Sequence, residues 1–144
     1  MSLSYRGRYT QMHGDYEQNT GLVSIAAGTT GSQVVWVNET GASVTVDSAY
    51  LTPSAAMSGT AHDNSSYQLI NKGTAGSGTK IISTALVTTL RTFTAFVPKA
   101  FTLAATATSV TVAAGEVVAL VKTETNTTGK LLPQGSLSLQ FRFA

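Results

Sequence analysis

The chain has 144 residues, of which 42% are hydrophobic and only 11% are charged, and its net charge is +2. This length fits one domain with a substantial core, and the charge is too small for a protein whose main partner is duplex nucleic acid, because that affinity rests on many phosphate contacts. The absence of cysteine excludes a disulfide framework, a thiolate nucleophile and cysteine-ligated zinc.

The first twenty residues differ from the rest of the chain. Residues 4–18 read SYRGRYTQMHGDYEQ and contain three of the five tyrosines, with no apolar periodicity. A segment with so few apolar groups cannot bury itself, so we predict that residues 1–20 form an extended arm that orders against a partner. Tyrosine and arginine are enriched at interface hot spots. The residues predicted to bind the partner are Tyr5, Arg6, Arg8, Tyr9 and Tyr16.

The residues of the arm raise two other possible functions, metal binding and contact with nucleic acid. His13, Asp15 and Glu17 stand at alternate positions, so on a strand they would share a face that could hold a metal. The chain offers no second cluster to complete such a site, and we predict a polar arm without metal. The arm's two arginines lie among acidic residues, which makes a poor phosphate stripe, so direct contact with nucleic acid is not expected.

From residue 21 the sequence predicts short strands. Residues 32–38 (SQVVWVN) and 43–50 (SVTVDSAY) flank the short link ETGA, which predicts a hairpin. Trp36 lies within the first of these strands, and we expect it in the core. Residues 51–66 form the one stretch long enough for a stray helical turn.

A second hairpin is predicted where residues 66–72 and 80–90 flank GTAGSGT. This loop with Lys80 resembles a phosphate-binding loop, but the last glycine and the lysine are not adjacent and no helix is expected to follow. We therefore interpret it as a hairpin loop. Residues 91–97 (RTFTAFV) predict a strand that Pro98 ends.

Residues 109–124 predict two strands around a turn at Gly115, and residues 135–144 (GSLSLQFRFA) predict the last strand. In that last strand apolar and polar residues alternate, which indicates one buried face. The total is eight or nine strands without a sustained helical period. The sequence therefore predicts an all-β fold, a β-sandwich of the jelly-roll type with about eight strands, over residues 21–144.

The chemistry needed for catalysis is sparse. His62 and Asp63 lie in a serine-rich loop, and no G-x-S-x-G motif supplies a nucleophile. The remaining carboxylates outside the arm stand singly, at Glu39, Asp47, Asp63, Glu116 and Glu124. We predict that the protein is not an enzyme and needs no cofactor. The N-terminus lacks an apolar signal region, and the longest apolar run near the end is Val117–Val121, so we expect a soluble intracellular product with no membrane contact.

Several features of the chain resemble one known family. They are SYQLINKG at residues 66–73, the Thr/Ala/Val-rich run at 102–112, AAGEVVAL at 113–120, and the link GKLLPQG into the final strand. Over residues 21–144 the chain resembles the jelly-roll head decoration (cement) proteins of tailed bacteriophages. The resemblance implies a homotrimer that binds the major capsid protein at threefold positions and stabilises the shell against packed DNA. It carries no catalytic residues, and it implies a place on the capsid exterior after synthesis in the host cytoplasm.

The composition agrees with this expectation, because assembly hides exposed strand edges and several weak contacts add up through multivalency. The arm would then dock on a neighbour, either by adding a strand to its sheet or by lying across the capsid subunit. The alternative is a receptor- or carbohydrate-binding β-sandwich, such as a fibre head. That alternative predicts Trp36, Tyr50 or Tyr67 on the surface, where a ring can stack on a sugar.

Overall fold

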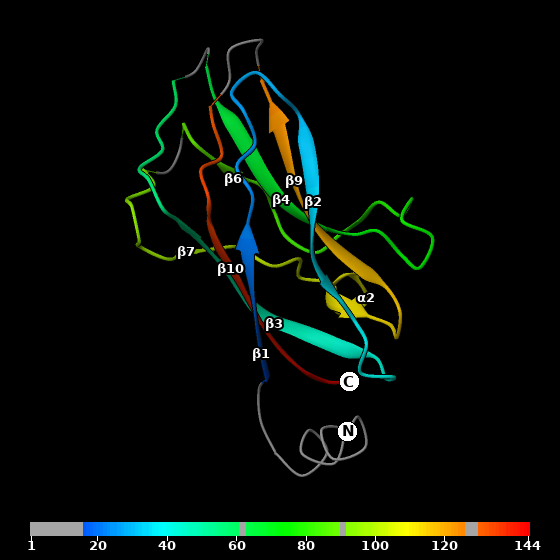
Figure 1. The fold of residues 1–144 in the computed structure, drawn as a ribbon. Helices are drawn as coiled ribbons and strands as arrows, with labels where there is room; N and C mark the ends of the chain where they lie inside the picture. Colours follow the sequence, from blue (N-terminus) through cyan, green and yellow to red (C-terminus); the bar gives the residue numbers. More distant parts are fainter. Residues whose placement is uncertain (1–15, 61–62, 90–91, 126–129) are drawn as a thin grey trace.

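The protein is described by a computed structural model that covers residues 16–60, 63–89, 92–125 and 130–144 (Figure 1). Two antiparallel sheets pack face to face, which confirms the all-β sandwich. The first sheet contains β1 (Tyr16–Leu22), β10 (Gly135–Phe143), β3 (Val44–Pro53) and β7 (Lys99–Ala100), with β8 (Thr111–Val112) also paired to β3. The second contains β2 (Gly31–Val37), β9 (Val117–Glu124), β4 (Ser65–Asn71) and β5 (Lys80–Ile81), with β6 (Leu86–Val87) also paired to β4.

Strand pairing is nested along the chain. The first strand pairs with the last (β1 with β10), the second with the second-last (β2 with β9), and the third with the third-last (β3 with β8). A long antiparallel ribbon of this kind, rolled so that successive strand pairs fall alternately in the two sheets, is a jelly roll. The predicted fold class is therefore confirmed.

The same nesting corrects one predicted pairing. Residues 32–38 and 43–50 do not form a hairpin, because β2 lies in one sheet and β3 in the other. β8 and β9 flank Gly115 as predicted, yet they also belong to different sheets. The hairpin around GTAGSGT is confirmed, since β4 pairs with β5 through Ile70–Ile81 and Asn71–Lys80.

Asn38 explains why the first link crosses between sheets. Its side chain is buried, and its Nδ2 donates to the carbonyl oxygens of Ala42 at 2.8 Å and Val112 at 2.9 Å. Its Oδ1 accepts from both the backbone N–H and the hydroxyl of Thr40. One amide therefore holds the turn and ties it to β8, and it satisfies polar groups that would otherwise be buried without a partner.

The predicted strand at residues 91–97 is wrong over its described part, and helix occurs elsewhere than in residues 51–66. Residues 92–97 form no strand and contribute only the isolated bridge between Phe93 and Met57. The described part of residues 51–66 contains no helix, because β3 continues through Pro53. The one helix in the described ranges is α2, at Ala107–Val110.

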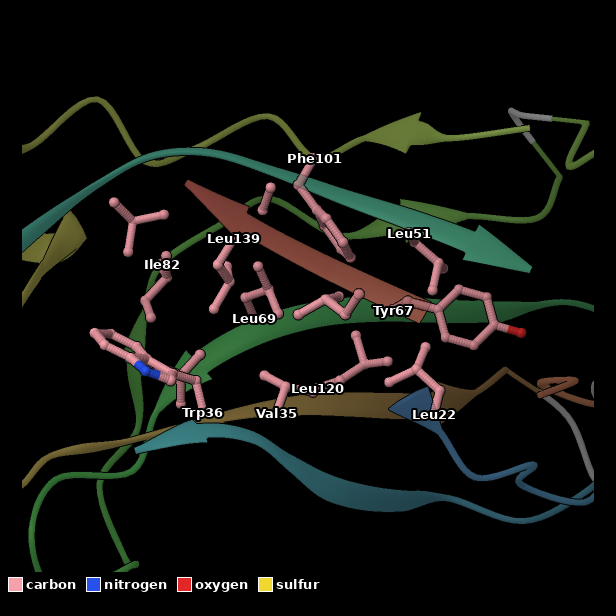
Figure 2. Close-up of a cluster of buried hydrophobic side chains, with 14 of the residues drawn as sticks. Leu22, Val35, Trp36, Leu51, Tyr67, Leu69, Ile82, Phe101, Leu120 and Leu139 are labelled. Atoms are coloured by element: carbon pink, nitrogen blue, oxygen red, sulfur yellow. The ribbon is translucent and has the colours of Figure 1, made fainter. Parts of the chain in front are cut away.

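The core lies between the two sheets (Figure 2). Leu137, Leu139 and Phe141 of β10 are buried, as the alternation in the last strand predicts. Trp36 is 9% exposed, which confirms its predicted place in the core. Figure 2 shows side chains of both sheets meeting there, among them Leu51 and Leu139 from the first sheet and Val35, Leu69 and Leu120 from the second.

The sandwich begins earlier than the sequence predicts. β1 starts at Tyr16 and pairs with β10 in continuous register from Tyr16–Phe141 to Leu22–Gly135. Residues 16–20, which the sequence places in the arm, are thus part of the first sheet. The boundary between arm and domain, predicted between residues 20 and 21, is therefore wrong, because the domain begins with β1 at Tyr16.

Candidate interaction surface

Tyr16 is an anchor at the base of the predicted arm. Its side chain is buried, and its ring lies 5.8 Å from that of Phe141 and 5.3 Å, edge to face, from that of Phe143. The Phe141 ring stacks in turn on Trp36 at 4.8 Å. Such aromatic pairs add stability beyond the area they bury. Tyr16 therefore fixes the start of β1 and is not available to a partner, which corrects its predicted role.

The other four predicted docking residues, Tyr5, Arg6, Arg8 and Tyr9, lie outside the described residues. The structure does show where the described chain starts. Tyr16 pairs with Phe141, near the end of β10, so β1 begins beside the C-terminus of the chain (Figure 1). Residues 1–15 therefore join the sandwich at this end.

The side edges of the sandwich are bridged by hydrogen bonds. On one side the Thr20 hydroxyl of β1 donates to the Val35 carbonyl of β2, and the Gln33 side chain makes two hydrogen bonds with the Val23 backbone, at 2.9 and 3.0 Å. On the other side the backbone joins Thr84 to Thr102 and Ala104 to Ile82. These bonds satisfy groups that a sheet edge would otherwise offer to another chain.

The described charges are mostly paired. Four of the six basic residues in the described ranges each face a carboxylate. The pairs are Lys80–Glu116 at 3.8 Å, Lys130–Asp63 at 2.8 Å, Arg142–Asp47 at 3.4 Å, and Lys122–Glu124. This arrangement leaves few cations in that part of the molecule to neutralise phosphates.

Glu116 stabilises the turn at Gly115. Its Oε2 accepts from Asn71 Nδ2 at 2.6 Å and from the Ala113 N–H at 2.8 Å. Burial alone would raise the pKa of the Glu116 carboxyl, but these two hydrogen bonds and the charge of Lys80 outweigh it and lower that pKa. The carboxylate is occupied by structural partners, so we assign it no catalytic role.

Lys122 is the buried charge that the sequence analysis missed. It is fully buried on β9, and its Nζ donates to the carbonyl oxygens of Ala26 at 3.0 Å and Thr29 at 2.9 Å. It also pairs with Glu124, which accepts from the Ser65 hydroxyl at 2.9 Å. Lys122 has the same strand phase as Val118 and Leu120, and this alternation is the signal that could have revealed its burial.

Two sites raised by the sequence remain without structural support. Across the described ranges, no three His, Cys, Asp or Glu side chains gather in a way that could hold a metal ion. Glu17 accepts a hydrogen bond from the Ser138 hydroxyl at 2.9 Å, while His13 and Asp15 lie outside those ranges. His62 is also outside them, and Asp63 pairs with Lys130.

The rings considered for sugar binding are mostly buried. Trp36 and Tyr67 lie in the core, and burial raises the pKa of Tyr67 to about 12 against the smaller opposing effect of a hydrogen bond with Ser65. Tyr50 is half-buried on β3. Two of the three predicted stacking rings are thus inaccessible to a sugar.

A second surface lies at the end of the sandwich away from Tyr16. Residues 92–98, here called the Phe96 loop, expose Phe96 (76%) and Val97 (47%). Beside the loop, Ala55, Ala56, Met57, Leu131 and Pro133 line a pocket of about 280 Å³, which we call the end pocket. Ser58 and Lys130 complete its described lining. Neither feature was predicted, because the sequence pattern placed Phe96 in a strand.

Comparisons of the chain with protein-family models, with curated proteins and with solved structures found no match. In the described ranges no helix has the length and apolar character required to cross a membrane.

Proposed function

We propose that this protein is a structural decoration protein of a tailed-phage capsid. It binds the major capsid protein on the outer surface of the shell as a homotrimer at threefold positions, and it stabilises the shell. The observation that carries the proposal is the relation between arm and domain. Residues 1–15, rich in tyrosine and arginine, join a jelly roll at the point where Tyr16 packs against Phe141 and Phe143.

The bonding of the rest of the domain is consistent with docking through the arm. Its side edges are bridged and four of its described cations are paired, so the sandwich has little tendency to add strands or bind phosphates. An arm fixed at its base loses less entropy on docking than a free peptide. Several arms attached to one trimer would bind the shell with an avidity that exceeds the affinity of each arm.

The test is a binding isotherm on expanded empty heads assembled from a tailed-phage major capsid protein. We expect the intact protein to bind saturably, in multiples of three copies per site. A variant that lacks residues 2–15 should bind at least 30-fold more weakly, because each lost hot-spot contact costs about 2 kcal/mol.

A variant with Tyr5 and Tyr9 replaced by alanine tests the rings while it leaves the length of the arm unchanged. A matched control replaces Thr10 and Gln11 by alanine, which alters the same segment without removing a ring or an arginine. If the intact protein does not bind the heads, or if the truncated protein binds them equally well, the docking arm is not the basis of function.

A further inference from the structure

Phe96 is held in an unfavourable backbone conformation while its side chain faces solvent. It is the most exposed large hydrophobic side chain of the described residues, and its φ is 61°. A bulky residue other than glycine rarely adopts a positive φ, since its Cβ crowds the backbone. The loop is fixed by hydrogen bonds from Phe96 N to the Pro53 carbonyl at 2.8 Å and from Val97 N to the Thr94 carbonyl at 3.2 Å. The fold therefore keeps a ring outward against two unfavourable effects, strain and exposure.

The end pocket has the size and chemistry to receive such a ring. A dry apolar cavity of about 150 Å³ holds a benzene molecule, and the end pocket measures about 280 Å³. Leu131, on its wall, is 48% exposed and would be covered by an occupant. The charged group in its described lining, Lys130, pairs with Asp63 at 2.8 Å, which lessens the cost of covering it.

Ring and pocket lie close together on each copy but do not fill one another. The Pro53 carbonyl that fixes Phe96 is two residues before Ala55 of the pocket, and the Met57–Phe93 bridge joins the two segments. Phe96 is not among the residues that line the pocket. Each copy thus carries an exposed ring and, at the same end, away from the base of the arm, a pocket with a mixed apolar and polar lining.

We propose that these two features form the contact between copies of this chain, with Phe96 of one copy inserted into the end pocket of the next. A ring and a pocket are different surface features, so the contact is heterologous and repeats until the ring of copies closes. This contact supplies the interface of the proposed homotrimer, and the number of three copies rests on the proposed function. The contact itself belongs to the free protein and does not need the shell.

The first test uses the absence of cysteine from the chain. Two single variants, Phe96→Cys and Leu131→Cys, are mixed and treated with a short bifunctional maleimide, so that a product containing both can form only between copies. We expect this mixture to cross-link at least 10-fold faster than a mixture of Val34→Cys and Leu131→Cys. Val34 is a matched control, because it is 58% exposed on β2, outside the pocket and the Phe96 loop. Equal rates for the two mixtures would overturn the proposal.

The second test separates assembly from strain. Asparagine tolerates a positive φ, so Phe96→Asn should raise the Tm of the dilute protein by about 3 °C while it weakens self-association at least 10-fold in sedimentation equilibrium. A higher Tm with unchanged association, or a wild-type protein that is monomeric at tens of micromolar, would refute the contact. Shell binding by Phe96→Asn is measured separately, because loss of shell binding by wild type would count against the decoration function and not against this contact.

Discussion

Lys122 and Glu124 lie two residues apart on β9 and form an ion pair whose side chains are 0% and 6% exposed. Lys122 also donates to the carbonyls of Ala26 and Thr29, so the pair ties the segment after β1 to the second sheet. Burial lowers the pKa of the Lys122 amine, because a charged group is disfavoured where water is excluded. Lys122 therefore fixes the position of the segment after β1, and the removal of its charge from water opposes this stabilisation.

Removing one partner of this pair should destabilise the protein more than replacing both. Lys122→Ala leaves Glu124 buried without its cation and two carbonyls without a donor, and we expect a loss of about 3–5 kcal/mol in the free energy of unfolding. The double variant Lys122→Met, Glu124→Gln retains volume and an acceptor for the Ser65 hydroxyl, and it should lose less. Urea titrations of wild type and both variants measure the difference. A double variant less stable than Lys122→Ala would contradict this account.

Stability at alkaline pH should depend on Tyr67. Its pKa is 10.0 when exposed and about 12 in the fold, where burial raises it. Between these values the unfolded state has lost the proton and the folded state retains it, so this contribution to stability is full below pH 10 and is lost as pH rises towards 12. The full effect is roughly 2–3 kcal/mol.

Tyr67→Phe is the matched variant, since it removes only the buried hydroxyl, which donates to the Met57 sulfur at 3.5 Å and also interacts with Ser65. The lowered pKa of Lys122 acts in the opposite direction, because it makes stability rise with pH up to 10.5. Both proteins contain Lys122, so its effect cancels in their difference. Unfolding free energies from pH 9 to pH 11.5 should fall more steeply for wild type, and parallel curves would show that Tyr67 does not titrate as described.

Two glycines of the first sheet should respond differently to alanine. A Cβ on Gly135 would overlap the Thr52 carbonyl oxygen and lie 3.0 Å from the Cα of Pro53, and backbone atoms in a central pair of strands cannot easily move. Gly135→Ala should cost about 1–3 kcal/mol. A Cβ on Gly21 meets nothing within 4 Å, so Gly21→Ala should change stability by less than about 0.5 kcal/mol. Thermal melts of the two variants decide whether the register at Gly135 is as tight as described.

The boundary between arm and domain can be measured by truncation. Deletion of residues 2–15 should leave the Tm within about 2 °C of wild type, because β1 and its pairing with β10 remain. Deletion of residues 2–22 removes Tyr16 and Leu22 from the core and exposes β10, and each buried side chain of this size contributes about 1.5–3 kcal/mol. Circular dichroism melts of both truncations test this, and a large loss of Tm in the shorter deletion would place the boundary before Tyr16.

Local patterns in the sequence were enough to predict the fold class and the orientation of the clearest strand. Alternation in residues 135–144 predicted burial of Leu137, Leu139 and Phe141, because successive side chains of a strand point to opposite faces. The abundance of Thr and Val, and the frequent turn residues, predicted strands without long helices. Strand alternation and turn composition depend on neighbouring residues, so they can be predicted from the sequence.

Which strands pair, and which surfaces stay exposed, depends on contacts between distant parts of the chain. Strand partners lie far apart in the chain, as in the pairs Val44–Val112 and Tyr16–Phe141. A turn such as ETGA does not reveal whether the strands on either side of it share a sheet or lie in different sheets. Tyr16, which the sequence assigned to the arm, lies in the core because Phe141 and Phe143 are its neighbours in space. Phe96, which the sequence assigned to a strand, lies in an exposed loop whose backbone is fixed by the hydrogen bond to the Pro53 carbonyl. Burial depends on what the rest of the chain brings alongside a residue, and the nested pairing of a jelly roll determines this over its whole length.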